Sequence, residues 1–234
     1  MAWGWTMLTA VDCLDLVHGA HPWCGNHGVV DPVLRLRTAL AAHHPADDRE
    51  VVAQATMLQA LDRLEHPFDR HADRTHVTAS GIVVGSQGVV LHRHRRLGRW
   101  LQPGGHVDDG EQPEDAVVRE CAEETGLSVT HPPGGPLLVH VDVHDAALDH
   151  VHLDLRYLVM APDEPPAPPP GESQEVAWFA WDDAERLADD ALRGALVVVR
   201  RHLRGLDEDG WPRDHPVAVG SGARVAGGGE RGGR

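Results

Sequence analysis

Three glutamates, Glu120, Glu123 and Glu124, lie in one short acidic stretch near the middle of the chain. If that stretch is helical, Glu123 and Glu124 follow Glu120 at the spacings that bring side chains onto one face. Carboxylates this close repel one another unless a positive charge lies among them. Oxygen ligands at this density suit Mg²⁺, with Mn²⁺ as a second choice, and proteins commonly hold Mg²⁺ with carboxylates and substrate phosphates together. The cluster therefore indicates metal-assisted chemistry on a diphosphate, and the alternative is a solvated acidic helix face.

A helix must hold these carboxylates, and the flanking residues predict where it begins and ends. Pro113 suits a first helical turn, where its missing N–H is not needed. Glu114 and Asp115 follow at positions where the helix dipole favours negative charge. Gly126 suits the left-handed residue that commonly follows a helix end. We therefore expect a helix from Pro113 to just before Gly126.

Residues 105–127 as a whole resemble the Nudix box, G-x5-E-x7-R-E-U-x-E-E-x-G-U, in which U is a bulky aliphatic residue. One position departs from it, because Cys121 occupies the first U position, although a buried cysteine behaves as a small hydrophobic residue. The positions that match are Gly105, Glu111, Arg119, Glu120, Glu123, Glu124, Gly126 and Leu127.

The resemblance implies a fold and a reaction. The fold is an α/β class Nudix-type α/β/α sandwich around a mixed β-sheet, with the box as loop, helix and loop. The reaction is hydrolysis of a pyrophosphate linkage in a nucleoside diphosphate linked to another moiety, by a hydrolase acting on acid anhydrides. By the same resemblance Glu120 and Glu124 would hold the metal, Glu123 would share that role, and the Gly105 carbonyl would join the metal shell.

Further roles follow from the same resemblance. Arg119 is expected to orient the catalytic carboxylates by pairing with Glu111 or Glu123, which makes Glu111 and the terminal Gly126 structural members of the box. Residues 173–179, SQEVAWF, resemble the glutamate-bearing Trp-Phe strand that follows the box in many of these enzymes. Glu175 would then be a further metal ligand or an acid/base group, with Glu172 as its competitor. The group that takes the proton from the attacking water stays open.

Strand-like segments flank the box. Residues 75–84 and 89–94 are rich in β-branched residues and enclose a Ser-Gln-Gly turn, which predicts a β-hairpin; residues 137–143 and 151–159 alternate apolar and polar side chains. The hairpin end carries a cationic run in an acidic chain, which would attract a polyphosphate unless it is only a solvated turn. The residues that we expect to bind substrate are Arg93, Arg95 and Arg99 from this run and His152 from the later strand.

The rest of the chain divides by composition. Residues 1–30 form a leader, expected to be poorly ordered, whose cysteines and histidines make a zinc site the alternative. Residues 31–70 form a helical extension, expected to pack on the main domain; an interface for a homodimer is the alternative. Residues 71–206 form the Nudix domain, whose last helical stretch is expected to break near Gly194. Residues 207–234 form a Gly-rich flexible tail.

Composition excludes several classes of protein. A formal net charge of −15 argues against a sequence-independent grip on nucleic acid, and we expect neither a nucleic-acid partner nor a membrane partner. No apolar run approaches the length of a membrane span. The 3 cysteines form no disulfide framework, so a cytoplasmic setting is expected.

The substrate stays open, because signatures of several Nudix subfamilies are absent. A non-catalytic nucleotide sensor on a Nudix scaffold is the alternative function, although such sensors typically lose box carboxylates or carry a DNA-binding domain. An isopentenyl-diphosphate isomerase shares the fold but needs a cysteine just before the box, and residues 100–107 contain none.

Overall fold

The computed structural model describes residues 31–209 of the 234. The predictions made for the leader at 1–30, its zinc alternative included, lie outside the described residues, as does most of the Gly-rich tail.

A mixed sheet of seven strands forms the centre of the described part. Its order is β3-β2-β1-β6-β5, with β4 also paired to β1 and β7 also paired to β2. β1 and β6 run parallel, and the other pairs are antiparallel. The strands are β1 (Thr75–Gly85), β2 (Gly88–Arg93), β3 (Trp100–Leu101), β4 (Gly104–His106), β5 (Leu137–Asp145), β6 (Val151–Met160) and β7 (Val176–Phe179).

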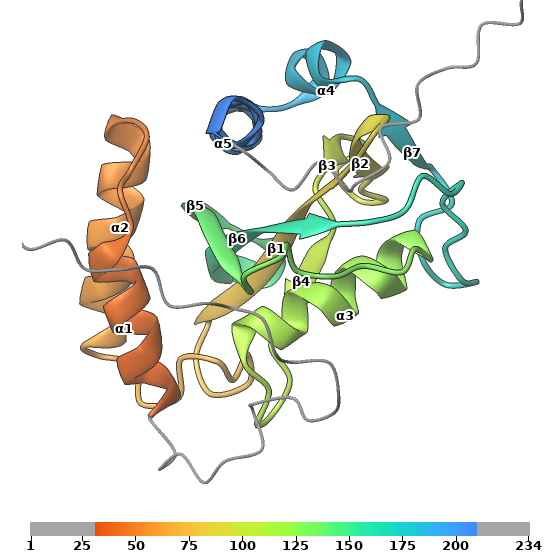
Figure 1. Ribbon diagram of the computed structural model, residues 1–234. Helices are drawn as coiled ribbons and strands as arrows, with labels where there is room; N and C mark the ends of the chain where they lie inside the picture. The colour runs from red at the N-terminus through yellow and green to blue at the C-terminus, as the bar shows by residue number, and fades with distance from the viewer. Residues whose placement is uncertain (1–30, 210–234) are drawn as a thin grey trace, which may run out of the picture. The chain divides into compact units, whose positions relative to one another are not determined.

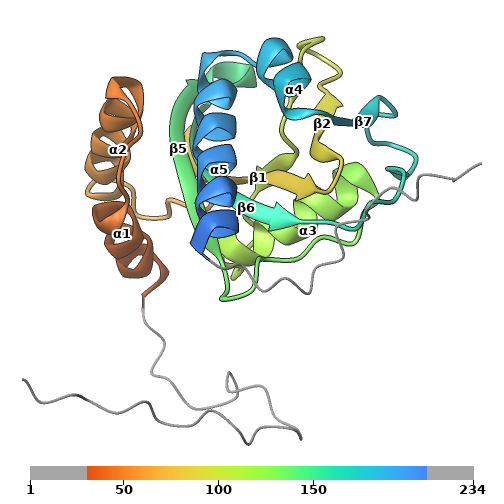
Figure 2. The ribbon, with the colours of Figure 1, turned by 45° about the horizontal axis from the view of Figure 1, so that its top comes forward.

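Helices cover both faces of this sheet (Figures 1 and 2). Successive residues of a strand point to opposite faces, so one set of side chains from β1 and β6 packs against α3 and the other packs against α4 and α5. The prediction of an α/β/α sandwich around a mixed sheet is therefore confirmed. The helices are α1 (Pro32–Ala42), α2 (Asp48–Leu61), α3 (Pro113–Thr125), the short 3₁₀ helix η1 (Ala147–Asp149), α4 (Trp181–Leu187) and α5 (Asp190–Asp209).

The box helix α3 begins and ends where its sequence signals predict. Pro113 occupies the first turn, and Gly126 takes a left-handed conformation with φ of 70° just past the end. A second constraint acts on Gly126, because a Cβ there would lie 2.0 Å from the carbonyl oxygen of Ala167 in the proline-rich loop. The amide of Ala167 in turn donates to the carbonyl of Thr125 at 2.9 Å, so this loop packs on the C-terminal end of α3.

The first two helices lie beside the sheet rather than apart from it. The Glu50 carboxylate of α2 is buried and accepts a hydrogen bond from the amide of Val141 in β5 at 2.9 Å. Leu40 and Met57 belong to the same apolar cluster as the residues of α3. Within residues 31–209, no helix has both the length and the apolar content that crossing a membrane requires.

The predicted break near Gly194 is wrong. The chain turns earlier, between α4 and α5, where the Asp189 carboxylate accepts a hydrogen bond from the amide of Leu192 at 3.0 Å. Gly194 lies inside α5, and a Cβ there would lie 3.2 Å from Nε2 of His140. The glycine therefore makes room for a close approach of the helix to β5, a function that local sequence does not distinguish from a break.

Candidate active site

The carboxylates of α3 face the glycine strand β4. Glu124 accepts a hydrogen bond from the backbone amide of Gly104 at 2.9 Å. Gly105 approaches Glu120 so closely that a Cβ at position 105 would lie 2.4 Å from the Glu120 carboxyl carbon. β4 pairs with β1, with Gly105 opposite Ala79, so the sheet fixes the backbone that these carboxylates meet. The local fold thus brings Gly105, Glu120 and Glu124 together.

Arg119 connects the acidic residues of the box. Its guanidinium donates to both carboxylate oxygens of Glu111, at 3.0 and 2.8 Å, and to Glu120 at 2.8 Å. It contacts Glu123 at 3.4 Å and donates to the backbone carbonyl of His106 at 3.0 Å. One cation therefore positions both the carboxylate cluster and the strand β4 that faces it.

Without a metal ion, burial disfavours the ionised forms of the Glu120 and Glu124 carboxylates. It raises the pKa of Glu124 to about 8, an effect that the Gly104 amide opposes and the neighbouring charges of Glu120, Glu172 and Glu123 increase. Burial also raises the pKa of Glu120, while Arg119 lowers it. The hydrogen bonds from Arg119 lower the pKa of Glu111, which suits a permanently charged structural partner.

Two of the expected substrate-binding arginines line one hollow with Glu175. The hollow has a volume of about 400 Å³ and is lined by Arg93, His94, Arg95, Gly98, Ser173, Gln174 and Glu175. Arg93 Nη1 donates to both oxygens of Glu175, at 3.0 and 3.2 Å, and the Glu175 side chain is 61% exposed. Arg95 donates to the carbonyl of Gly171 at 2.6 Å. Arg99 instead forms an ion pair with Asp189 at 3.6 Å.

Glu172 lies within electrostatic reach of the carboxylate cluster, because its charge contributes to the raised pKa of Glu124. The loop that carries it also packs on the end of α3 through Ala167. Of the two glutamates that compete for a role beside the box, Glu175 is hydrogen-bonded to Arg93, whereas the charge of Glu172 adds to the raised pKa of Glu124.

His92 is a neighbour of the cluster that the sequence pattern did not single out. It is buried on β2, with Nδ1 3.7 Å from Oε2 of Glu124, and burial lowers its pKa to about 4. His92 lies two residues after Val90, which packs in the same apolar cluster as α3. This strand periodicity was the available signal that His92 points toward the box helix rather than into solvent.

His152 lies in a different group of side chains. Its ring packs 5.1 Å from that of His76 and 5.4 Å from that of His106, measured between centroids. Burial and neighbouring histidines lower the pKa of His152 to about 4. The four expected substrate-binding residues therefore divide between the hairpin end and this histidine group.

Comparison with known proteins identifies this arrangement. A family model described as the NUDIX domain matches residues 74–203, which is more than half of the chain. The chain belongs to the Nudix family. As a Nudix hydrolase, it is an enzyme of the pyrophosphohydrolase class.

Several proteins resemble this Nudix hydrolase over most of their own length. An oxidized purine nucleoside triphosphate hydrolase from Mus musculus is 31% identical over 148 residues, covering 55% of this chain and 85% of its own. A MutT-like protein from Streptomyces ambofaciens is 32% identical over 137 residues, covering 54% and 82%. The solved structure of a Nudix-family hydrolase from Clostridium perfringens is 31% identical, covers 57% of this chain and 99% of its own, and has a TM-score of 0.47.

Nudix hydrolases generally require divalent metal ions, and the carboxylate cluster of this member fits such an ion. Its donors are all oxygens, which hard divalent cations prefer. The raised pKa of Glu124 means that full ionisation needs a compensating positive charge. The missing side chain of Gly105 leaves the backbone of β4 open toward Glu120.

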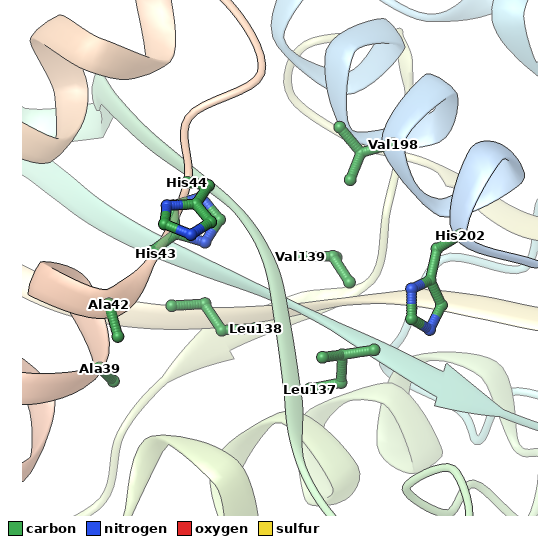
Figure 3. Close-up of a pocket in the computed structure, with 9 residues that line it drawn as sticks. All are labelled: Ala39, Ala42, His43, His44, Leu137, Leu138, Val139, Val198 and His202. Carbon is green, nitrogen blue, oxygen red and sulfur yellow. The ribbon is translucent and has the colours of Figure 1, made fainter. Parts of the chain in front are cut away.

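A second hollow of this Nudix hydrolase lies between α1, β5 and α5 (Figure 3). It is lined by Ala39, Ala42, His43, His44, Leu137, Leu138, Val139, Val198 and His202. Its lining contains no carboxylate and no residue of the box.

Proposed function

We propose that this Nudix hydrolase cleaves a pyrophosphate linkage in a nucleotide-type substrate, a nucleoside diphosphate linked to another moiety, with Mg²⁺ as cofactor or Mn²⁺ in its place. The ligands are the carboxylates of Glu120, Glu123 and Glu124 and the backbone carbonyl of Gly105. The observation that carries the proposal is the contact of one guanidinium, Arg119, with the carboxylates of Glu111, Glu120 and Glu123.

The divalent ion, when bound, neutralises diphosphate charge and stabilises the negative charge that grows in the transition state. The protein holds the ligands ready for it. Arg119 keeps Glu120 oriented, and the Gly104 amide keeps one oxygen of Glu124 in place at 2.9 Å. Such pre-oriented carboxylates need little reorganisation when substrate arrives.

The cationic hairpin end supplies substrate contacts in this proposal. Arg93 and Arg95 exchange their present partners, the Glu175 carboxylate and the Gly171 carbonyl, for substrate phosphates. Release from Arg93 would also free Glu175 to serve as a further metal ligand. Arg99 and His152 remain candidate contacts for the parts of the substrate beyond the diphosphate.

The names of the relatives support a purine nucleotide as the first substrate to test. The mouse relative is named for hydrolysis of oxidized purine nucleoside triphosphates, and a Proteus vulgaris relative, 39% identical over 57 residues, is named 8-oxo-dGTP diphosphatase. Another relative, from Shewanella woodyi and 43% identical over 53 residues, is named RNA pyrophosphohydrolase, so an RNA end is a further substrate class to test.

The test is a screen of the full chain, with Mg²⁺ and with EDTA, against purine and oxidised purine nucleoside triphosphates, ADP-ribose, nucleotide sugars and dinucleoside polyphosphates. Chromatography of the nucleotide products identifies the bond that is cut. We expect Mg²⁺-dependent release of a nucleotide from at least one of these. Inactivity on every compound, together with tight binding of one nucleotide, would favour the sensor function instead.

A further inference from the structure

Three histidines on three neighbouring strands point into one space beside the box. In the sheet register His76 of β1 lies opposite His152 of β6, and Thr78 of β1 lies opposite His106 of β4. Side chains two residues apart on a strand share a face, and the three ring centroids lie 5.1, 5.2 and 5.4 Å from one another. One ring nitrogen from each histidine lies within 4.8 Å of the others.

His76 presents an unsatisfied nitrogen in this group. Its Nδ1 lies 3.3 Å from the carbonyl oxygen of Asp73, an acceptor, so Nδ1 carries the proton. Its Nε2 is then a lone-pair acceptor, and it is buried without a hydrogen-bond partner. The whole side chain is fully buried. A buried acceptor without a partner is costly, and a bound cation would satisfy it.

We propose that His76, His106 and His152 form a second metal site, for a borderline divalent cation such as Zn²⁺. Three imidazole nitrogens without a carboxylate suit Zn²⁺ and not Mg²⁺, so the two sites of this chain select different ions. The Asp73 carbonyl that accepts from Nδ1 of His76 is the kind of hydrogen-bond partner that metal-binding histidines usually have on their other ring nitrogen.

Metal binding requires a modest contraction of the group. Ligand nitrogens around a tetrahedral zinc lie roughly 3.4 Å apart, given its usual bond lengths. His106 and His152 are only half-buried, so their rings can rotate toward His76. Three protein ligands leave a fourth position for water or a further ring, and the His150 ring lies 5.2 Å from that of His76.

One positive charge opposes the site. An Arg70 Nη1 atom lies 3.3 Å from Nδ1 of His106, and because arginine only donates, it favours the neutral ring form with its proton on Nε2. With a metal on Nε2, the neutral ring of His106 would carry its proton on Nδ1 instead, and Nδ1 could no longer accept from Arg70. Removal of Arg70 should strengthen metal binding, which gives the proposal a gain-of-affinity test.

Strand β4 connects the proposed metal site to the carboxylate cluster. His106 is the last residue of β4, whose Gly104 amide binds Glu124 and whose His106 carbonyl accepts from Arg119 at 3.0 Å. An ion bound by His106, His76 and His152 would link β4 to β1 and β6. The existence of the site does not depend on which diphosphate is cleaved.

The experiment measures zinc bound by the full chain after removal of metal and dialysis against Zn²⁺ buffered at low free concentration. We expect one equivalent in the wild type and at least about tenfold weaker binding in His76→Gln and in His152→Gln. Substitution by Co²⁺ should give the visible absorption of a tetrahedral site in the wild type and not in His76→Gln or His152→Gln. Arg70→Ala should bind zinc more tightly than the wild type.

Two matched variants separate this site from other histidines and cysteines. His44→Gln removes an exposed histidine elsewhere, and Cys24→Ala removes a cysteine of the leader. Both should keep the bound zinc. Zinc retained by the His76 and His152 variants, or lost in Cys24→Ala alone, would overturn the proposal. If circular dichroism shows that His76→Gln does not fold, the half-buried His106→Gln and His152→Gln decide in the same way.

Discussion

Both carboxylate oxygens of Glu111 accept hydrogen bonds from the guanidinium of Arg119, Oε1 from Nε at 3.0 Å and Oε2 from Nη2 at 2.8 Å. This paired geometry leaves Nη1 free to hold Glu120 at 2.8 Å. A lysine has a single ammonium group and cannot reproduce both sets of contacts.

Arg119→Lys should therefore lower kcat by about 10- to 100-fold while the fold is retained, since outer-shell partners of metal ligands typically contribute that much. Steady-state kinetics on the substrate found in the screen would measure it. Arg35→Lys is the matched control. Arg35 on α1 forms an ion pair at 3.6 Å with Glu114, which lies on the box helix α3 but outside the cluster. Equal activity of Arg119→Lys and wild type would contradict the orienting role.

Gly105→Ala should weaken binding of Mn²⁺ at the carboxylates. The added Cβ would lie 2.4 Å from the Glu120 carboxyl carbon, so that carboxylate must move away from β4. Titration of Mn²⁺ followed by its electron paramagnetic resonance signal would report the loss of affinity. Unchanged affinity with unchanged thermal stability would show that Glu120 is not held against this glycine.

Stability should fall as pH falls from 6.5 toward 4, in part because of His140. Burial, and then the charge of Arg156, lower the pKa of His140 from 6.5 to about 4, while Glu50 and the aspartates oppose the shift. Between these values the unfolded state binds more protons than the folded state, so acid favours unfolding. Glu124 acts in the opposite sense, since its raised pKa of about 8 makes the metal-free protein less stable as pH rises from 4.5.

Comparison of wild type with His140→Gln isolates the His140 contribution from that of Glu124. Urea denaturation at several pH values between 4 and 7 would give the slope of the unfolding free energy for each protein. The wild type should take up about one more proton on unfolding than the variant near pH 5. Parallel slopes for the two proteins would contradict the expected behaviour of His140.

Gly81→Ala should destabilise the protein by about 1–3 kcal/mol through overpacking between β1 and α3. The added Cβ would lie 2.4 Å from Sγ of Cys121 and 2.9 Å from Cγ2 of Val159. Adding Cys121→Ala should recover part of the loss, since it removes the nearer atom. Chemical denaturation of both single variants and the double variant tests this, and strictly additive effects would show that the two positions do not compete for space.

The box helix was predictable because its signals are local. Pro113 and Gly126 mark its ends, and the buried Cys121 packs as the small hydrophobic residue expected at its position. The hairpin of β1 and β2 was predictable for the same reason, since a Ser-Gln-Gly turn separates two β-branched segments.

The partners of distant residues were not predictable in the same way. Arg93 meets Glu175 and Arg99 meets Asp189 only because β7 and α4 return past the hairpin. The histidine group depends on the register of three strands, which no single segment specifies. The helix break predicted at Gly194 was wrong because a glycine that ends a helix cannot be distinguished in sequence from one that makes room for a neighbouring histidine.

Glu124→Gln tests the central claim most directly. The glutamine keeps the size and the Gly104 contact but removes the charge that the metal needs, so metal-dependent release of a nucleotide should fall by at least about 100-fold. Glu114→Gln, on the first turn of the same helix, should retain wild-type turnover. Wild-type turnover by a folded Glu124→Gln protein would contradict the assignment of the active site.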